Sequence, residues 1–296
     1  MYTNTKYFAA AVPAIVAAAA LLAGCVGSGR NSDTAAEIND FEVDQVIKSA
    51  ARSYRGMLYG DTVYLTLSAT VQWPERFGEY DIVTLRRHIL AEAFADTVGT
   101  GDVDAAIRRF IDNTSVVDAD TVGTDDGGEG LFSDVEVVSA PAPGIDCYEV
   151  TVSARLTMLS EQMVSYDVLT SSYLGGAHPN YASTPFTYVF ELGQIVTYDT
   201  LFKEGTGEAV SEALNRAAAD QYGTRPYRLT RKSFFSDTLA VSHEVSISGS
   251  SVVFHYNPYD VAPYSEGMID VEVPAFMLAD CLTDPYRRLL DDEADE

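Results

Sequence analysis

The first twenty-five residues restrict the fold most strongly, because they separate a removable leader from everything downstream. Lys6 is followed by an apolar run from Phe8 to Leu22, and small residues then precede Cys25. A positive start, a short apolar core and small residues before a break are typical of a secretory signal peptide. No second run of eighteen or more apolar residues occurs, so we expect nothing else to span a bilayer. About 270 residues remain to fold as exported, globular material.

The order Leu22-Ala23-Gly24-Cys25 resembles a bacterial lipoprotein signal. The resemblance implies cleavage before Cys25 and a diacylglyceryl thioether on its sulfur, so the bilayer is the first expected partner. An ordinary signal peptide with a chance cysteine is the alternative. We therefore divide the start of the chain into a signal peptide, residues 1–24, and a lipid-anchored tether, residues 25–54, with a short helix near 41–52. The expected location is the bacterial cell envelope outside the cytoplasm, on the periplasmic or surface face of a membrane.

The chain is strongly acidic, with a formal charge of −25 that becomes −26 (−25 − 1) once Lys6 leaves with the leader. This excludes nucleic acid as a partner, because binding there requires Lys and Arg to neutralise phosphates. It also disfavours direct adhesion to anionic lipid. In most acidic proteins the negative charge serves solubility. The more specific alternative is that the electrostatic field of the chain steers a basic partner towards it.

Two cysteines remain after Cys25, namely Cys147 and Cys281. A disulfide between them is one reading for an exported protein, and two buried thiols are the other. Spacing alone does not decide between these readings, because bridging needs specific geometry.

Strands and helices follow one another in mixed order, which favours an α+β fold with antiparallel sheets and packed helices. Apolar periodicity predicts two helices through Ile82–Ala93 and Val103–Phe110. A third is predicted over Gly207–Tyr222, which carries Ala, Val, Leu and Glu without a breaker. Alternation predicts the first strand at Asp61–Gln72, ended by Pro74, and hairpin signals recur later. The acidic stretch Asp118–Gly130 is expected to be a loop. The later expected strands are Cys147–Met158, Met163–Leu174, Phe186–Glu191, Ile195–Tyr198, His243–Ser248, Ser251–Tyr256 and Met268–Val273.

No catalytic motif is present, so we expect no enzyme, no catalytic residue, no metal and no cofactor. The chain lacks Gly-x-Ser-x-Gly, His-Glu-x-x-His, Cys-x-x-Cys and a phosphate-binding glycine loop. If Gly249-Ser250 is a two-residue turn, Val245 faces Phe254 and Glu244 faces His255. That register predicts a cross-strand charge pair at His255 and argues against a His243–His255 metal site.

Two loops stand out as candidate partner-binding surfaces. The first runs from Tyr173 to Tyr181 and the second from Tyr256 to Tyr264. Paired glycines permit positive φ, prolines stiffen both loops, and tyrosines offer rigid contact area. Tight structural connections between strands are the alternative. The candidate residues are Tyr173, Gly175, Gly176, His178, Tyr181, Tyr259, Pro263 and Tyr264.

These loops resemble a bacterial extracytoplasmic domain family, the DUF3298/DUF4163 type. It occurs in lysozyme-sensing anti-sigma factors of the RsiV type and beside the catalytic domain of certain peptidoglycan deacetylases. Matching features are Tyr173-Leu174-Gly175-Gly176-Ala177-His178-Pro179-Asn180 and the run Phe254–Gly267. The resemblance implies two α+β sub-regions, residues 55–185 and residues 186–296 with an acidic tail, and it implies binding without catalysis.

Two functions follow as expectations. A lipid-anchored protein of this kind captures a basic protein such as lysozyme, which suits the acidic charge. The alternative is an accessory lipoprotein that binds cell-wall glycan, peptidoglycan, through exposed tyrosines.

Overall fold

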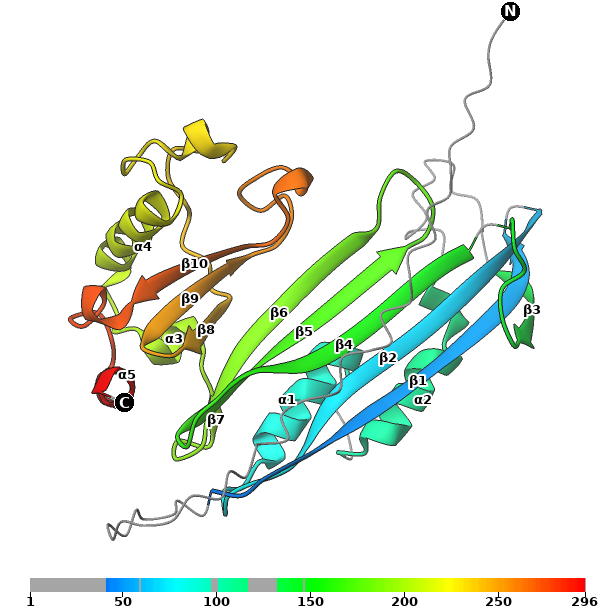
Figure 1. Ribbon diagram of the computed structural model, residues 1–296, viewed down its shortest axis with the longest axis horizontal. Coiled ribbons are helices and arrows are strands. Elements are labelled where there is room, and N and C mark those ends of the chain that lie inside the picture. Colours follow the sequence, from blue (N-terminus) through cyan, green and yellow to red (C-terminus); the bar gives the residue numbers. More distant parts are fainter. Residues whose placement is uncertain (1–40, 59, 97–100, 117–131, 146, 296) are drawn as a thin grey trace, which may run out of the picture. The chain divides into compact units, whose positions relative to one another are not determined.

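Two β-sheets and five α-helices make up the described part of the chain, a computed structural model covering residues 41–58, 60–96, 101–116, 132–145 and 147–295 (Figure 1). The leader, Cys25, the tether up to residue 40 and the expected loop Asp118–Gly130 lie outside the described residues. Residues from Asp40 onward form one unit. In the described ranges, no helix has the length and apolar character that crossing a membrane requires.

The larger sheet has seven strands in the order β3-β1-β2-β4-β5-β6-β7. Every neighbouring pair is antiparallel except β2 and β4, which run parallel. A parallel pair needs a long crossover, and the helices between these two strands supply it. The α+β prediction is confirmed, with this one parallel pair as the departure from it. The strands are β1 Val43–Leu58, β2 Asp61–Phe77, β3 Ser133–Val138, β4 Cys147–Leu159, β5 Met163–Tyr173, β6 Asn180–Val189 and β7 Gln194–Ile195.

The short helix expected near 41–52 is wrong, because these residues form most of β1. This strand pairs with β2 along its whole length, and its side chains alternate between the two faces. Two inward positions are occupied by Lys48 and Arg52, which form ion pairs with Asp104 and Asp112. Long basic side chains can cover apolar surface while pairing their charges, so the inner face lacks the apolar alternation that marks a strand.

Pro74 does not end β2, which continues to Phe77. The register of the β1–β2 pair shifts between Asp44 and Gln45, next to Pro74. A proline cannot donate to a strand ladder and is tolerated where pairing is irregular, so the shift accommodates it.

Two helices cover one face of the large sheet, α1 Val83–Phe94 and α2 Val103–Asp112, followed by the short 3-10 turn η1 Thr114–Val116 (Figure 1). Both were predicted. Leu85, Ile89 and Leu90 of α1 are fully buried, as the helical spacing of apolar residues requires. Asp102 caps α2, its side chain accepting the Ala105 N–H at 3.0 Å.

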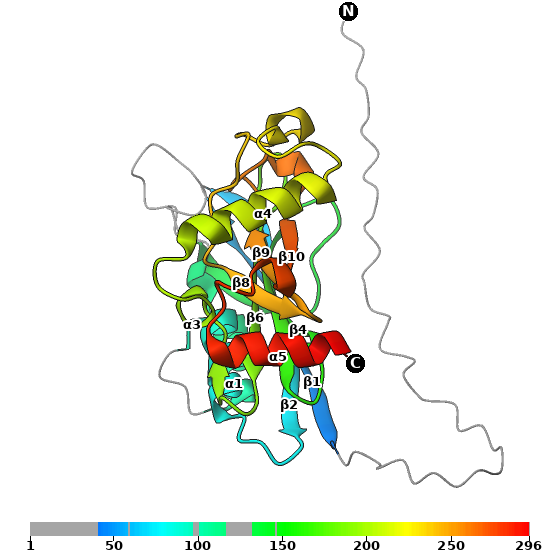
Figure 2. The same ribbon diagram turned by 90° about the vertical axis from the view of Figure 1, so that its left-hand side faces the viewer.

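The smaller sheet has the order β10-β9-β8, with β8 Val245–Ser248, β9 Ser251–Tyr256 and β10 Ile269–Pro274. Val245 pairs with Phe254 and Ile247 with Val252, so the predicted hairpin register is confirmed. The predicted helix α4, Gly207–Gln221, lies across β9 and β10 (Figure 2). The remaining elements are α3 Tyr198–Leu201, η2 Leu229–Lys232, η3 Tyr264–Glu266, η4 Ala275–Met277 and α5 Asp284–Asp295.

Buried polar bonds fasten β8 to the large sheet. The Ile247 N–H donates to Thr187 Oγ1 at 2.8 Å, and Ser165 Oγ donates to the Ile247 carbonyl at 2.9 Å. Unpaired buried polar groups are costly, so these reciprocal bonds fix where the small sheet attaches. The expected division between residues 185 and 186 falls inside β6, and β7 is the last strand of the large sheet.

Candidate functional site

The two loops that stand out in the sequence contact each other. The hairpin loop between β5 and β6 places the His178 ring on the Tyr264 ring, with centroids 3.8 Å apart and planes 20° apart. Tyr264 also donates its hydroxyl to the Pro179 carbonyl at 2.5 Å. Residues 85 positions apart in the chain are therefore joined by both stacking and a hydrogen bond.

Two more tyrosines extend this stack. Tyr181 meets the edge of Tyr264 at 5.4 Å, and Tyr259 lies at 5.8 Å from the same ring. Tyr259 remains 57% exposed and has a positive φ of 73°, a strained conformation for a non-glycine residue. Burial against these neighbours raises the pKa of Tyr264. We call His178, Tyr181, Tyr259 and Tyr264 the aromatic surface.

Backbone geometry explains the shape of the first loop. Gly175 and Gly176 have φ values of 92° and 97°, which L side chains rarely adopt. Tyr173 closes the loop by donating its hydroxyl to the Gly176 carbonyl at 3.3 Å, and it is 37% exposed. These three predicted residues therefore shape the loop rather than join the ring stack. Pro263 does the same in the second loop, where it directly precedes η3.

Sequence reasoning missed Asn257, which holds the second loop in place. Its side-chain amide bonds both backbone groups of Ser183, accepting the N–H at 2.7 Å and donating to the carbonyl at 3.0 Å. Its own N–H donates to Asp260 Oδ2 at 2.7 Å. Asn followed by Pro is a turn signal, but a signal of this kind does not reveal a partner on β6.

A groove of about 230 Å³ lies between β5, β6 and the small sheet. Its acidic residues are Asp167, Asp270 and Glu272, and no Lys or Arg lines it. Asp167 is held by Arg155, 3.1 Å away, and by the Ser183 hydroxyl. We call this the carboxylate groove. Its other lining residues are Thr157, Met158, Ser165, Ser183, Pro185, Ser246, Ile247, Ser248, Val253, His255 and Met268.

The predicted Glu244–His255 charge pair is wrong at the side-chain level. Glu244 does accept the His255 backbone N–H, at 3.0 Å, as the register requires. The buried imidazole instead bonds Ser246 Oγ through Nε2 and Asp270 Oδ1 through Nδ1, both at 2.7 Å. Asp270 stands directly opposite His255 on β10, a strand that the two-strand register did not include.

This Ser246–His255–Asp270 chain has the residue order of a nucleophile, a base and an orienting carboxylate. Acyl transfer also requires donors for the oxyanion, often including the N–H after the nucleophile. That amide belongs to Ile247 and already donates to Thr187. The arrangement therefore suits a polar network on the groove wall better than a hydrolytic centre.

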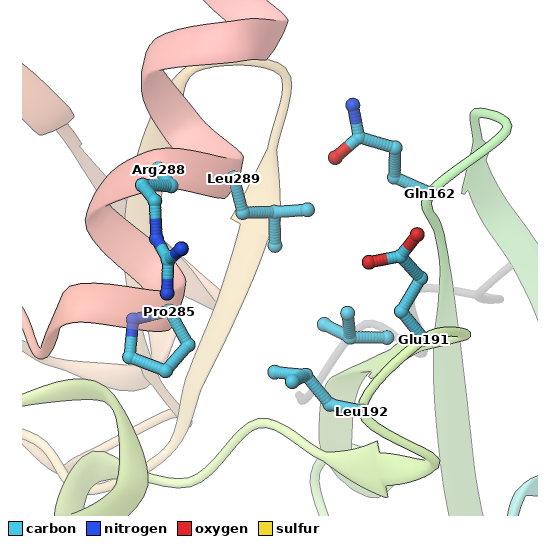
Figure 3. Close-up of a pocket in the computed structure, with 7 residues that line it drawn as sticks. Gln162, Glu191, Leu192, Pro285, Arg288 and Leu289 are labelled. Atoms are coloured by element: carbon cyan, nitrogen blue, oxygen red, sulfur yellow. The ribbon is translucent and has the colours of Figure 1, made fainter.

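Two other depressions lie on the described surface. One, about 350 Å³, is a shallow site on β4, β5 and β6 beside Tyr181, lined by Thr170, Ser171, Ser172 and Asn180 among others. The second, about 250 Å³, separates Pro285, Arg288 and Leu289 of α5 from Gln162, Glu191 and Leu192 (Figure 3). Over the described ranges, no group of three or more His, Cys, Asp or Glu side chains could hold a metal ion.

The two cysteines are free thiols. Cys147 begins β4 in the large sheet, whereas Cys281 is buried in the core of the small-sheet region. They thus belong to different parts of the fold and form no disulfide. Burial raises the pKa of both thiols, so neither is an activated thiolate.

Residues 199–275 match the family model described as "Protein of unknown function (DUF3298)". This segment is a DUF3298 domain. The resemblance inferred from the two loops is confirmed for this family, whereas the lipoprotein signal and the RsiV-like role stay predictions. The DUF3298 domain contributes Tyr259 and Tyr264, and the β5–β6 loop supplies the facing rings from outside it.

Solved structures of DUF3298 family members share the fold. One from Bacteroides fragilis NCTC 9343 has a TM-score of 0.59 at 14% identity, covering 87% of this chain and 98% of that chain. Another from Pseudomonas aeruginosa PAO1 has a TM-score of 0.51 at 13% identity, covering 83% and 96% respectively. No curated protein matches the chain significantly.

Proposed function

We propose that this chain is an exported, lipid-anchored binding protein that captures a basic protein, such as lysozyme, on its aromatic surface. The observation that carries the proposal is the stack of His178 on Tyr264, which unites two distant loops into one rigid surface. Aromatic side chains that are held in place lose little entropy on binding and dominate the energetics of many protein interfaces.

Charge around the stack supports a basic partner. Asp260 in the second loop and Glu266 just after it are both exposed. Ser183, which Asn257 of that loop contacts, lines the carboxylate groove. A Lys or Arg side chain entering the groove would meet Asp270 and Glu272, and also Asp167, which Arg155 already pairs from outside the lining. The net charge of −25 would also accelerate the encounter with a cationic protein.

The proposed anchor is the acylated Cys25, with the residues up to 40 as the tether. It would hold the binding unit in the cell envelope, on the periplasmic or surface face of a membrane. We propose binding without catalysis, cofactor or metal, since the Ser246–His255–Asp270 chain has its neighbouring amide already engaged.

Titration of residues 30–296 with a C-type lysozyme, at low and physiological salt, tests the proposal. Tyr264→Ala should weaken binding about 30-fold or more, the effect of a central aromatic contact. His178→Ala and the more exposed Tyr259→Ala should also weaken it. The matched control is Phe276→Ala, since Phe276 is 79% exposed and lies outside the aromatic surface.

Binding that survives physiological salt and depends on these rings would support the proposal. Binding that disappears with salt, or equal affinity for all four variants, would contradict it. Thermal unfolding of each variant separates lost binding from lost folding.

Glycan binding is the second candidate, favoured by the shallow site beside Tyr181. Its lining combines hydroxyl and amide groups with the Tyr181 ring and the apolar Val150, Leu174 and Ala182, a mixture that suits the two faces of a sugar such as those of peptidoglycan. Titration with soluble peptidoglycan fragments distinguishes the two, because sugar binding should depend on Tyr181 and Asn180 and should change little with salt.

A further inference from the structure

One short segment concentrates positive charge in this acidic protein. Four of the nineteen Lys and Arg residues lie within eight positions, at Arg225, Arg228, Arg231 and Lys232. All four are exposed and, with Gly223 and Thr224, they line a recess of about 670 Å³. We call Gly223–Phe235 the basic segment.

None of these four cations forms an ion pair with another described residue. Most other described Lys and Arg residues form ion pairs, as in Arg55–Glu136 and Arg155–Asp167, because 44 acidic residues are available; the exceptions are Arg87, Arg108, Lys203 and Arg288. Like charges placed together repel one another. Apart from the attraction of Arg228 and Arg231 to Asp237, the described residues supply no counter-charge to this cluster, which points to a ligand that supplies negative charge.

The segment is held rigidly. Leu229 and Phe234 are buried, and Asp237 accepts both the N–H and the hydroxyl of Thr230, at 3.1 and 2.5 Å. These bonds lower the pKa of Asp237. The Phe235 N–H donates to the Val261 carbonyl at 2.9 Å, which ties the segment to the loop carrying Tyr259.

Backbone strain and exposed aromatic rings occur within the same segment. Tyr227 and Ser233 have φ values of 61° and 68°, and both are non-glycine residues that rarely adopt such angles. Tyr227 is 55% exposed and Phe235 is 57% exposed. Two exposed aromatic rings beside four cations combine the features of membrane-surface sites, in which basic groups meet lipid phosphates and rings enter the interface.

We propose that the basic segment docks the DUF3298 domain onto a bilayer surface rich in anionic phospholipid. The physiological setting rests on the proposed acylation of Cys25, which would keep the segment close to such a surface. The net negative charge does not prevent docking, because screening at physiological salt limits each charge to about 8 Å. Arginine suits the phosphate groups, since its planar guanidinium donates two parallel hydrogen bonds.

Vesicle flotation of residues 30–296, which lack the acylated cysteine, tests the segment by itself. The probes are vesicles of phosphatidylcholine alone and vesicles with about one third phosphatidylglycerol. We expect binding only to the anionic vesicles and weaker binding at higher salt. Arg225→Gln with Arg228→Gln should reduce partitioning about 25-fold, since each basic residue near such a surface contributes about fivefold.

The matched control is Arg87→Gln with Arg108→Gln, which removes two exposed, unpaired cations from α1 and α2. It changes net charge equally but should leave partitioning within about twofold, because these residues lie outside the basic segment. Tyr227→Ala with Phe235→Ala should reduce partitioning severalfold if the rings enter the interface.

Equal partitioning of wild type on neutral and anionic vesicles would overturn the proposal, as would equal losses in the segment variant and its control. Full displacement by millimolar inorganic phosphate, together with no effect of the aromatic variant, would assign the recess to a free anion and also overturn it. None of these readouts involves lysozyme, so failure here is distinct from failure of the proposed function.

Discussion

The large-sheet region and the small-sheet region use charge in opposite ways. Seven of the nine ion pairs that Lys and Arg form between described residues lie within residues 42–167, and several join distant elements, such as Lys48–Asp104 and Arg55–Glu136. The two such pairs of the small-sheet region, Arg216–Glu212 and Arg287–Asp284, are local. Six described Lys and Arg residues of that region have no ion pair, among them the four of the basic segment, and the region carries exposed tyrosines. Ion pairs thus connect distant elements in the first region, whereas we propose that the exposed cations of the second meet a partner.

The family match points the same way. The DUF3298 model covers residues 199–275, within the small-sheet region, although structural similarity spans most of the chain. A scaffold can keep its fold while its sequence changes, provided that pattern and volume are kept. A surface that recognises a partner depends on particular side chains.

Core truncations should produce the largest effects and test whether the two regions unfold together. Leu85 of α1 and Leu214 of α4 are fully buried in different cores, so each Leu→Ala change should cost about 2–5 kcal/mol. The polar bonds at Ile247 couple the sheets, so both variants should lower one shared transition, followed by circular dichroism in urea. Two separate unfolding transitions, each shifted by only one of the variants, would show that the two regions unfold independently. Val83→Ala, at a 45% exposed position on α1, is the control.

Acid sensitivity should belong to the large-sheet region. His88 packs edge-on against Phe186 at 4.4 Å, and burial lowers the pKa of His88 to about 4, below its ordinary value of 6.5. Between these pH values His88 therefore binds a proton in the unfolded chain but not in the folded chain. The free energy of unfolding falls as the pH drops from about 6.5 towards 4. At pH 5 the loss should be roughly 1–2 kcal/mol, discounted because 27% of the side chain is exposed.

Urea unfolding at pH 7 and pH 5 measures this loss. His88→Gln should reduce the difference between the two pH values, because glutamine does not titrate in this range. His243→Gln, at an exposed histidine in the small-sheet region, should leave the difference unchanged. An equal pH dependence in wild type and His88→Gln would assign the acid sensitivity to other groups.

Local pattern predicted the elements whose partners are close in sequence. Helices α1, α2 and α4 and the β8–β9 register follow from apolar spacing and from one turn. The pattern failed at β1, where Lys48 and Arg52 occupy inward positions that only their pairing with α2 explains. It also failed at His255, whose partner Asp270 lies on a strand that follows a long connection.

The site was predictable as two loops but not as one surface. Paired glycines, prolines and tyrosines mark each loop by local chemistry. Their contact depends on how the small sheet attaches to β5 and β6, through Asn257, Ser183 and Ile247. Such bonds between elements leave no periodic signal in a sequence. Sequence reasoning did not single out the basic segment, and the absence of ion pairs at its four cations can be seen only in the folded chain.

The smallest effects should distinguish the two uses of charge most directly. Arg155→Gln removes a pair with Asp167, whose side chain is only 14% exposed, so it should cost about 1 kcal/mol. Arg228→Gln removes one of four clustered cations, so it should raise stability by a few tenths of a kcal/mol. Chemical unfolding at low salt measures both, and 0.5 M salt should diminish both. An equal loss of unfolding free energy in the two variants would mean that Arg228 stabilises the fold through contacts other than ion pairs. The proposed difference in the use of charge between the two regions would then not hold at Arg228.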